Sequence, residues 1–302
     1  MNSTVKTPLE RLNLTDRFLF AETMDDPEAY EAMVGILLEN EIELLERTQT
    51  EKELRVSPEL RAVRLDVIGM DRGGQVYFTE MQKTNTRNLE KRSRYYQAQL
   101  DVSLLEPGCG DFNKLNDSCM ILVAPFDLFG CGLYRYTFVG QCKEIPSLAL
   151  RDGAVRIFIN THGTNKENFS QEFLDFMEYI NDTRETVAAR SQSRRVKRIH
   201  SQVEKVRRSE KCGVKYMQRW EEIVYARQDG HMAGYEEAYR EGVLRDINAV
   251  CKKLIKGKSA AQIADELEQE PEKIVQICCI AEKYAPTYNA DEIWEELADS
   301  VK

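Results

Sequence analysis

Two carboxylates, Asp66 and Glu80, stand inside an otherwise apolar stretch of the chain. They belong to the segment "LDVIGMDRGGQVYFTEMQ", residues 65–82, in which two apolar runs flank a pair of glycines. This pattern predicts a β-hairpin, because glycines supply the positive φ values that a tight turn requires. If the two arms pair around residues 72–74, Asp66 lies opposite the neighbourhood of Glu80.

Two facing carboxylates repel each other unless a proton or a cation lies between them. Oxygen ligands with open positions suit Mg²⁺ or Mn²⁺, and the backbone carbonyl of Met81 can add a third oxygen. Such a metal polarises a phosphodiester and lowers the pKa of a bound water. The segment therefore predicts a divalent-metal site at Asp66, Glu80 and Met81. The alternative is that Asp66 flanks a turn and that Glu80 points into solvent from an edge strand.

Gln82 is the next residue on the same face as Glu80, because residues two apart in a strand point the same way. Its amide can orient a water molecule but cannot supply a positive charge. The stretch after Gln82 predicts a helix over residues 88–105 that carries Arg94 and Tyr96 in its first half. Arg94 can contact a phosphate or orient a carboxylate. Alternatively, it is a surface arginine beside core tyrosines.

The motifs "RLDVIG", "VYFTEMQ" and "RSRYYQAQL" together resemble the PD-(D/E)XK nuclease family transposases, also called recombination-promoting nucleases. The resemblance covers most of the first 170 residues and extends more loosely to "LTDRFLFAETM" and to the tail. It implies a restriction-endonuclease-like core, a mixed central sheet flanked by helices, that cuts DNA with Mg²⁺ or Mn²⁺. Carried over by position, Asp66 and Glu80 would be metal ligands. Gln82 would be the third catalytic residue, where most of the wider superfamily has lysine.

A third acidic side chain, Glu22, lies in the expected first helix. It is a candidate for supporting the metal site from outside the ligand set. The alternative is a solvated helix residue. The three histidines of the chain, His162, His200 and His231, lie far apart in the sequence with no nucleophile pattern nearby, and no catalytic role is assigned to them.

The elements around this block are those of an α/β fold. Residues 27–37 predict a helix with Asp26 as its cap and Pro27 at its first position. A charged link over residues 44–60 leads into the hairpin. The runs "SCMILVA", "YRYTFVGQ" and "AVRIFIN" predict further strands. From Ser170 onward the pattern is helical, which predicts a nuclease-like domain over residues 1–170 and an all-α region over residues 171–302.

The helical region contains a basic run that can follow a phosphate backbone. It can equally be the solvated face of a long helix. The candidate DNA-binding residues are Arg194, Arg195, Lys197, Arg198, Lys205, Arg207 and Arg208. Further on, residues 252–284 predict three packed helices. Gly257 ends the first, Ser259 and Gln262 form a capping box for the second, and Pro271 opens the third. This acidic tail suits packing, partner docking or homodimer formation better than DNA recognition.

The composition limits the classes of function. The chain has 302 residues and a formal net charge of -9, which excludes a uniformly basic nucleic-acid coat but not a local basic groove. Its eight cysteines include no C-x-x-C pair, which argues against structural zinc and for a reducing compartment. The chain shows no signal-peptide pattern and no apolar run of about 18 residues. We therefore expect a cytoplasmic protein without membrane partners.

These observations favour a Mg²⁺- or Mn²⁺-dependent DNA endonuclease associated with recombination or mobile elements. The alternative is a catalytically weak or inactive nuclease-fold module that binds DNA or protein. The intact set of Asp66, Glu80 and Gln82 argues against decay of the site. A transposase with three dispersed carboxylates finds no support, because the second half of the chain predicts no strand that bears an acidic residue.

Overall fold

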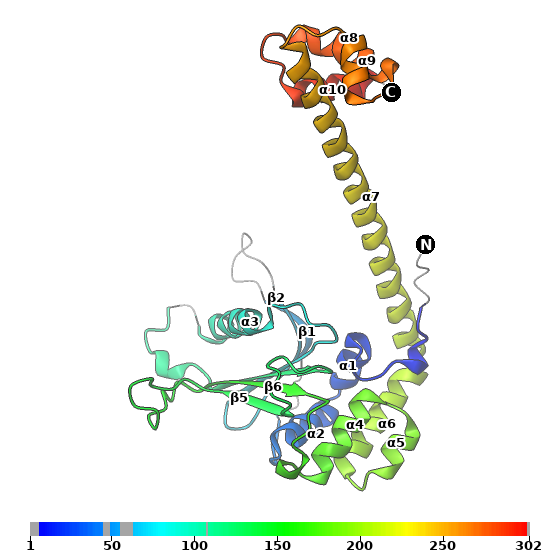
Figure 1. The fold of residues 1–302 in the computed structure, drawn as a ribbon. Helices are drawn as coiled ribbons and strands as arrows, with labels where there is room; N and C mark the ends of the chain where they lie inside the picture. Colours follow the sequence, from blue (N-terminus) through cyan, green and yellow to red (C-terminus); the bar gives the residue numbers. More distant parts are fainter. Residues whose placement is uncertain (1–5, 45–48, 55–62, 107, 301–302) are drawn as a thin grey trace. The chain divides into compact units, whose positions relative to one another are not determined.

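Six strands form one mixed sheet in the first part of the chain (Figure 1). The computed structural model describes residues 6–44, 49–54, 63–106 and 108–300. The strands are β1 Gln49–Leu54, β2 Val63–Met70, β3 Val76–Met81, β4 Ser118–Ala124, β5 Arg135–Phe138 and β6 Ala154–Asn160. Their order across the sheet is β1-β2-β3-β4-β6-β5. The α/β class expected from the sequence is therefore confirmed.

The central strands β3, β4 and β6 run parallel, whereas β1, β2 and β5 run antiparallel to their neighbours. A parallel pair needs a crossover connection, and α3 (Leu89–Leu104) provides it between β3 and β4. The carboxyl ends of β3, β4 and β6 consequently share one edge of the sheet. Ligands of open α/β sheets commonly bind at this edge.

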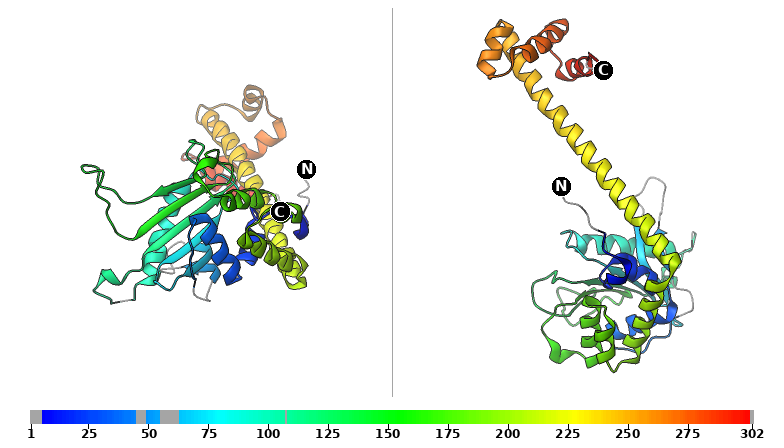
Figure 2. Two further views of the ribbon diagram at one scale, coloured as in Figure 1. Left: turned by 90° about the horizontal axis from the view of Figure 1, so that it is seen from below. Right: turned by 90° about the vertical axis from the view of Figure 1, so that its right-hand side faces the viewer.

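Helices cover both faces of the sheet (Figures 1 and 2). On one face, Phe78 and Leu122 pack with Leu89 and Leu100 of α3. The other face packs against the larger helical layer. The helices of that layer are α1 Arg17–Met24, α2 Pro27–Leu38, α4 Gln171–Asn181, α5 Glu185–Arg190 and α6 Arg194–Arg208. This part of the protein therefore has three layers. Of the helices named here, α3 lies on the face of the sheet to which Phe78 points, and the others lie on the opposite face.

Local sequence signals place the expected ends of several elements. Asp26 caps α2 by accepting a hydrogen bond from the N–H of Ala29, and Pro27 occupies the first turn. Gly74 has a φ of 86° in the turn between β2 and β3, as a glycine turn requires. Ser170 caps α4 in the same way that Asp26 caps α2. The hairpin, α3 and the strands β4, β5 and β6 all confirm the sequence prediction.

Two expectations differ from the structure. The charged link contains strand β1, which pairs with β2 from Gln49 to Leu54. Its sequence, QTEKEL, carries no apolar alternation, and only pairing with a formed β2 makes it a strand. The compact units also divide between Gln218 and Arg219 rather than near residue 170. The helices α4, α5 and α6 belong to the first unit because their apolar faces complete its core.

The second unit, Arg219–Lys302, is entirely helical in its described residues. It contains most of α7 (Glu210–Leu254), followed by α8 Ala260–Leu267, α9 Pro271–Ala281 and α10 Ala290–Ser300, coloured orange to red in Figure 2. Ser259 and Gln262 form the expected capping box of α8. Ile247, Ile263, Ile274 and Ile293 meet in its core. No helix among the residues that the structure describes is long and apolar enough to cross a membrane.

Candidate active site

Asp66 of β2 and Glu80 of β3 meet in the middle of the sheet. The register pairs Val67 with Thr79, so Asp66 follows directly opposite Glu80. The N–H of Asp66 donates a hydrogen bond to Oε1 of Glu80 at 3.0 Å, and the N–H of Met81 donates to Oδ2 of Asp66 at 3.0 Å. The two residues are 0% and 3% exposed. Glu80 therefore lies on a central strand and not on a solvated edge.

Arg17, at the start of α1, places a positive charge against this pair. Its Nε lies 2.5 Å from Oδ1 of Asp66, and its side chain is 43% exposed. Asp16 fixes this end of the helix by accepting a hydrogen bond from the N–H of Phe18. Sequence reasoning missed Arg17, because no spacing rule connects the start of a helix with a strand that follows 49 residues later. The segment "LTDRFLFAETM" contains Arg17, and its loose resemblance to the first helix of the nuclease family was the signal that could have pointed to this residue.

The pKa of Glu80 is raised to about 8. Burial of the carboxyl is the largest cause, and the negative charge of Asp66 adds to it. The positive charges of Arg17 and Arg92 and the backbone hydrogen bond from Asp66 oppose the rise. At neutral pH the raised pKa favours the protonated form of Glu80, because its buried carboxyl lies beside the negative charge of Asp66.

Gln82 lies at the carboxyl end of β3, beside the N-terminal half of α3. Its Nε2 donates to the carbonyl oxygen of Thr84 at 2.6 Å, and its Oε1 accepts a hydrogen bond from Nη2 of Arg92. The Arg92 guanidinium also lies 5.4 Å from the centre of the Tyr96 ring. Burial raises the pKa of Tyr96, and the charge of Glu80 raises it further. Tyr96 therefore lies near Glu80 and Arg92.

Arg94 occupies another side of α3. It is exposed and lines a separate cavity, whereas Arg92 is the arginine of α3 that contacts Gln82 and Tyr96. Successive helix residues are about 100° apart, so Arg92 and Arg94 point roughly 200° apart. Residues four apart share a face, which brings Arg92 and Tyr96 together. The helical period was the signal that could have identified Arg92.

Glu22 makes its contacts away from the two carboxylates. Its oxygens accept from Nζ of Lys215 at 3.0 and 3.1 Å, and Sγ of Cys212 lies 3.4 Å from Oε2. This ion pair connects α1 with the beginning of α7 within the first unit. The contacts described for Glu22 give it a part in helix packing, and none of them reaches Asp66 or Glu80.

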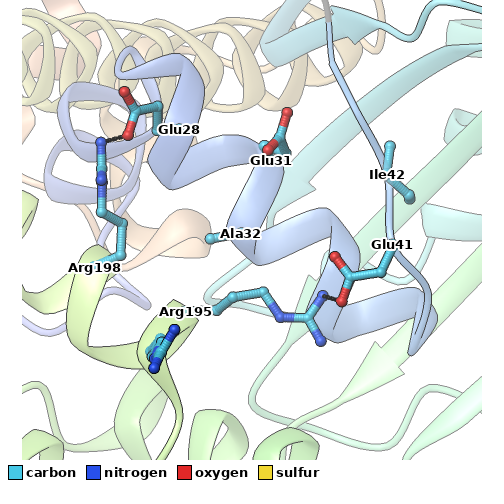
Figure 3. A pocket seen from close by; sticks show the side chains of 8 residues that line it. Glu28, Glu31, Ala32, Glu41, Ile42, Arg195 and Arg198 are labelled. Carbon is cyan, nitrogen blue, oxygen red and sulfur yellow. Dashed lines mark ion pairs between the residues drawn. The ribbon is translucent and has the colours of Figure 1, made fainter.

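The basic run forms α6, and several of its arginines bond to carboxylates of the same unit. Arg195 pairs with Glu172 and lies 3.8 Å from Glu41, while Arg198 pairs with Glu28. Figure 3 shows the latter two contacts across a cavity of about 360 Å³ beside α2. The opposite face of the helix is buried through Val196, Ile199, Val203 and Val206.

The remaining basic residues of α6 fall into two groups, those paired with a carboxylate and those exposed to solvent. Arg207 lies 2.9 Å from Glu204 and is largely buried, and Arg208 lies 3.4 Å from the same carboxylate. Arg194, Lys197 and Lys205 are exposed, and the described parts of the chain give them no ion pair. Four of the seven candidate DNA-binding residues are therefore engaged in ion pairs, and three present free positive charge.

The acidic side chains that could bind a metal ion at this place in the sheet are those of Asp66 and Glu80. Within the residues described, no group of three or more His, Cys, Asp or Glu side chains is arranged to hold a metal ion. Two neighbouring carboxylates fit a divalent cation in charge and in ligand type, because a hard cation takes oxygen ligands and its charge offsets their repulsion. The remaining ligands of a hard cation would be backbone oxygen and water. No protein-family model, curated protein or solved structure matches the chain.

Proposed function

We propose that the protein is a divalent-metal-dependent endonuclease that hydrolyses phosphodiester bonds of DNA. The observation that carries the proposal is the buried apposition of Asp66 and Glu80 on neighbouring strands. The mixed sheet, with its hairpin and the helix that follows the hairpin, supports a restriction-endonuclease-like core. The resemblance to recombination-promoting nucleases supports a setting in recombination or in mobile elements.

Asp66 and Glu80 would hold Mg²⁺ or Mn²⁺, with the Met81 carbonyl as a further oxygen ligand. A bound metal supplies a water of lowered pKa and polarises the phosphate. The chain's own contribution is rigidity, since backbone N–H groups hold both carboxylates in fixed orientations. Burial of the pair strengthens every charge interaction at this place, because the local dielectric is low.

Gln82 and Arg92 would act on the opposite side of the reacting phosphate. Arg92 holds the carbonyl oxygen of the Gln82 amide and one N–H of its nitrogen donates to Thr84, so the second N–H is the group that remains to orient water. The guanidinium of Arg92 supplies the positive charge that a lysine at position 82 would otherwise bring close to the phosphate. Arg17 would give up its contact with Asp66 when the metal binds.

Nicking of supercoiled plasmid tests the proposal. The wild type should nick DNA in Mg²⁺ and fail in EDTA, and Asp66→Asn and Glu80→Gln should lose activity by a factor of about 100 or more, equivalent to roughly 2.7 kcal/mol of transition-state stabilisation. Glu90→Gln is the matched control, because Glu90 is an exposed carboxylate on α3. Full nicking by Asp66→Asn would overturn the assignment.

A second function, a DNA- or protein-binding module without cleavage, has one observation in its favour. Asp66 already pairs with Arg17, and only two acidic side chains form the donor set in the described residues. Such a module would bind DNA equally in EDTA and in Mg²⁺ and would leave plasmid supercoiled in both. Gel-shift and nicking assays on one preparation distinguish the two functions.

A further inference from the structure

A cavity of about 290 Å³ lies in the first unit, between α3 and the neighbouring strands β5 and β6. It lies on the Arg94 side of α3, away from Arg92 and Tyr96, and near the amino end of β6. Ligand pockets usually measure roughly 300–1,000 Å³, so this one suits a small ligand. Its lining includes four charged side chains, Arg94, Asp101, Asp152 and Arg156, and the ring of Phe138.

Asp101 supplies an acceptor that lacks a donor. Its Oδ1 is buried and has no hydrogen-bond partner in the described structure. Burial raises the pKa of Asp101, and the nearby negative charge of Asp152 raises it further. A buried acceptor without a partner is costly, and nearly all such groups in native proteins are hydrogen-bonded. Because Oδ1 is closed to solvent, the Asp101 side chain would rotate to bring this oxygen to the N–H donors of a ligand in the cavity.

Arg94 and Arg156 supply donors that lack an acceptor. Arg94 is exposed on α3, and Arg156 extends from β6, opposite Phe138 of β5. Across the described ranges, neither guanidinium forms an ion pair. The cavity of Figure 3 is different, because its Arg195 and Arg198 already bond to carboxylates. Guanidinium groups bind phosphate through paired hydrogen bonds.

Phe138 supplies a flat apolar wall. Its ring lies 5.0 Å from the ring of Phe129 and 5.6 Å from that of Phe158, which holds its orientation. The side chain nevertheless remains 42% exposed. Aromatic side chains of this kind stack against nucleobases, since every base has an aromatic face.

We propose that this cavity binds a guanine nucleotide. The base stacks on Phe138, its adjacent N1–H and N2–H₂ groups donate to the Asp101 carboxylate, and the phosphate accepts hydrogen bonds from Arg94 and Arg156. Guanine is preferred because it is the base whose edge offers two neighbouring donors to one carboxylate. The inference goes beyond cleavage of DNA and uses none of the residues of the Asp66–Glu80 pair.

Isothermal titration of the full chain with GMP tests the site, with EDTA present so that the result is independent of metal and cleavage. One saturable GMP site is expected, with AMP at least tenfold weaker and inorganic phosphate weaker still. Asp101→Asn should remove the difference between GMP and AMP. Arg156→Gln should weaken both nucleotides by a similar factor of ten or more. Thermal melting checks that each variant is folded.

Arg151→Gln is the matched control, because Arg151 is an exposed arginine next to Asp152 that does not line the cavity. Its GMP affinity should equal that of the wild type. Binding of a guanine-containing oligonucleotide without binding of GMP would assign the site to a nucleotide within a nucleic-acid chain. Absence of saturable binding by both, or equal affinity for GMP and AMP in the wild type, would overturn the proposal.

Discussion

The backbone N–H of Asp66 donates a hydrogen bond of 3.0 Å to Oε1 of Glu80, which joins two carboxylate residues of neighbouring strands at one place. Glu80 in turn lies one residue before Met81, whose N–H donates to the Asp66 carboxylate. Each carboxylate is thus fixed by the backbone of the other strand. Their mutual repulsion is reduced by the raised pKa of Glu80, which favours its neutral form, and by the positive charge of Arg17.

Metal binding should depend on this pair. Mg²⁺ or Mn²⁺ at a hundred times its dissociation constant should stabilise the wild type by about 2.7 kcal/mol, because the ion binds the folded state preferentially. Asp66→Asn should abolish this gain, because it removes one of the two carboxylates that would hold the ion. Differential scanning calorimetry with each ion and with EDTA gives the comparison. An undiminished metal response in Asp66→Asn would mean that the ion binds elsewhere.

Stability should fall as pH rises through the neutral range. The pKa of Glu80 is raised from 4.5 to about 8, so between these values the folded protein holds a proton that the unfolded chain has released. The free energy of unfolding should therefore decrease with a slope approaching about 1.4 kcal/mol per pH unit for one proton. Urea unfolding in EDTA from pH 5 to 8 measures the slope. Glu80→Gln should flatten it, and an unchanged slope in that variant would contradict the raised pKa of Glu80.

Arg17→Met should destabilise the metal-free protein, because Asp66 is fully buried and loses a cationic partner. The loss should be about 1–2 kcal/mol, below the ~3–5 kcal/mol of wholly buried pairs, since the Arg17 side chain is 43% exposed. Mg²⁺ should restore more stability to this variant than to the wild type, because arginine no longer competes with the ion. Chemical unfolding of both proteins with and without Mg²⁺ measures the gain in stability that the ion gives to each. Identical metal gains in both proteins would show that Arg17 and metal do not compete.

Gln82→Ala should lower plasmid nicking by a factor of about ten or more, equivalent to ~1.4 kcal/mol in the barrier. The substitution removes the amide that orients water and leaves Arg92 without one of its acceptors. Gln82→Lys should retain or increase activity, because an ammonium group can also stabilise developing negative charge. Initial nicking rates at saturating DNA provide the measurement. Wild-type rates in Gln82→Ala would make this side chain a bystander.

DNA affinity should depend on the free charges of α6 and not on its paired arginines. Changing Arg194, Lys197 and Lys205 to Gln should reduce the slope of log affinity against log salt by up to roughly 2.7, since each phosphate contact contributes about 0.9. Arg198→Gln is the matched control, because Arg198 already pairs with Glu28. Fluorescence anisotropy over a salt series measures both. Equal slopes in the triple variant and the wild type would make α6 a solvated face.

Several elements could be predicted from the amino-acid sequence because their signals are local. Asp26 with Pro27, Ser170, and Ser259 with Gln262 cap their helices through neighbours within three residues. The hairpin followed from alternation and from Gly74, and hairpin pairing then brought Asp66 opposite Glu80 without help from distant residues. These features depend on short stretches of chain, so a single sequence carries them.

Tertiary structure alone decided three other features. Arg17 reaches Asp66 from α1, and Arg195 reaches Glu172 from another helix, because packing brings together residues far apart in the chain. β1 became a strand through pairing with β2, although its residues show no strand pattern. Burial then raised the pKa of Glu80, since the cost of removing charge from water depends on what surrounds the group in space. Contacts and dielectric surroundings of this kind arise when the layers assemble, and no spacing along the chain encodes them.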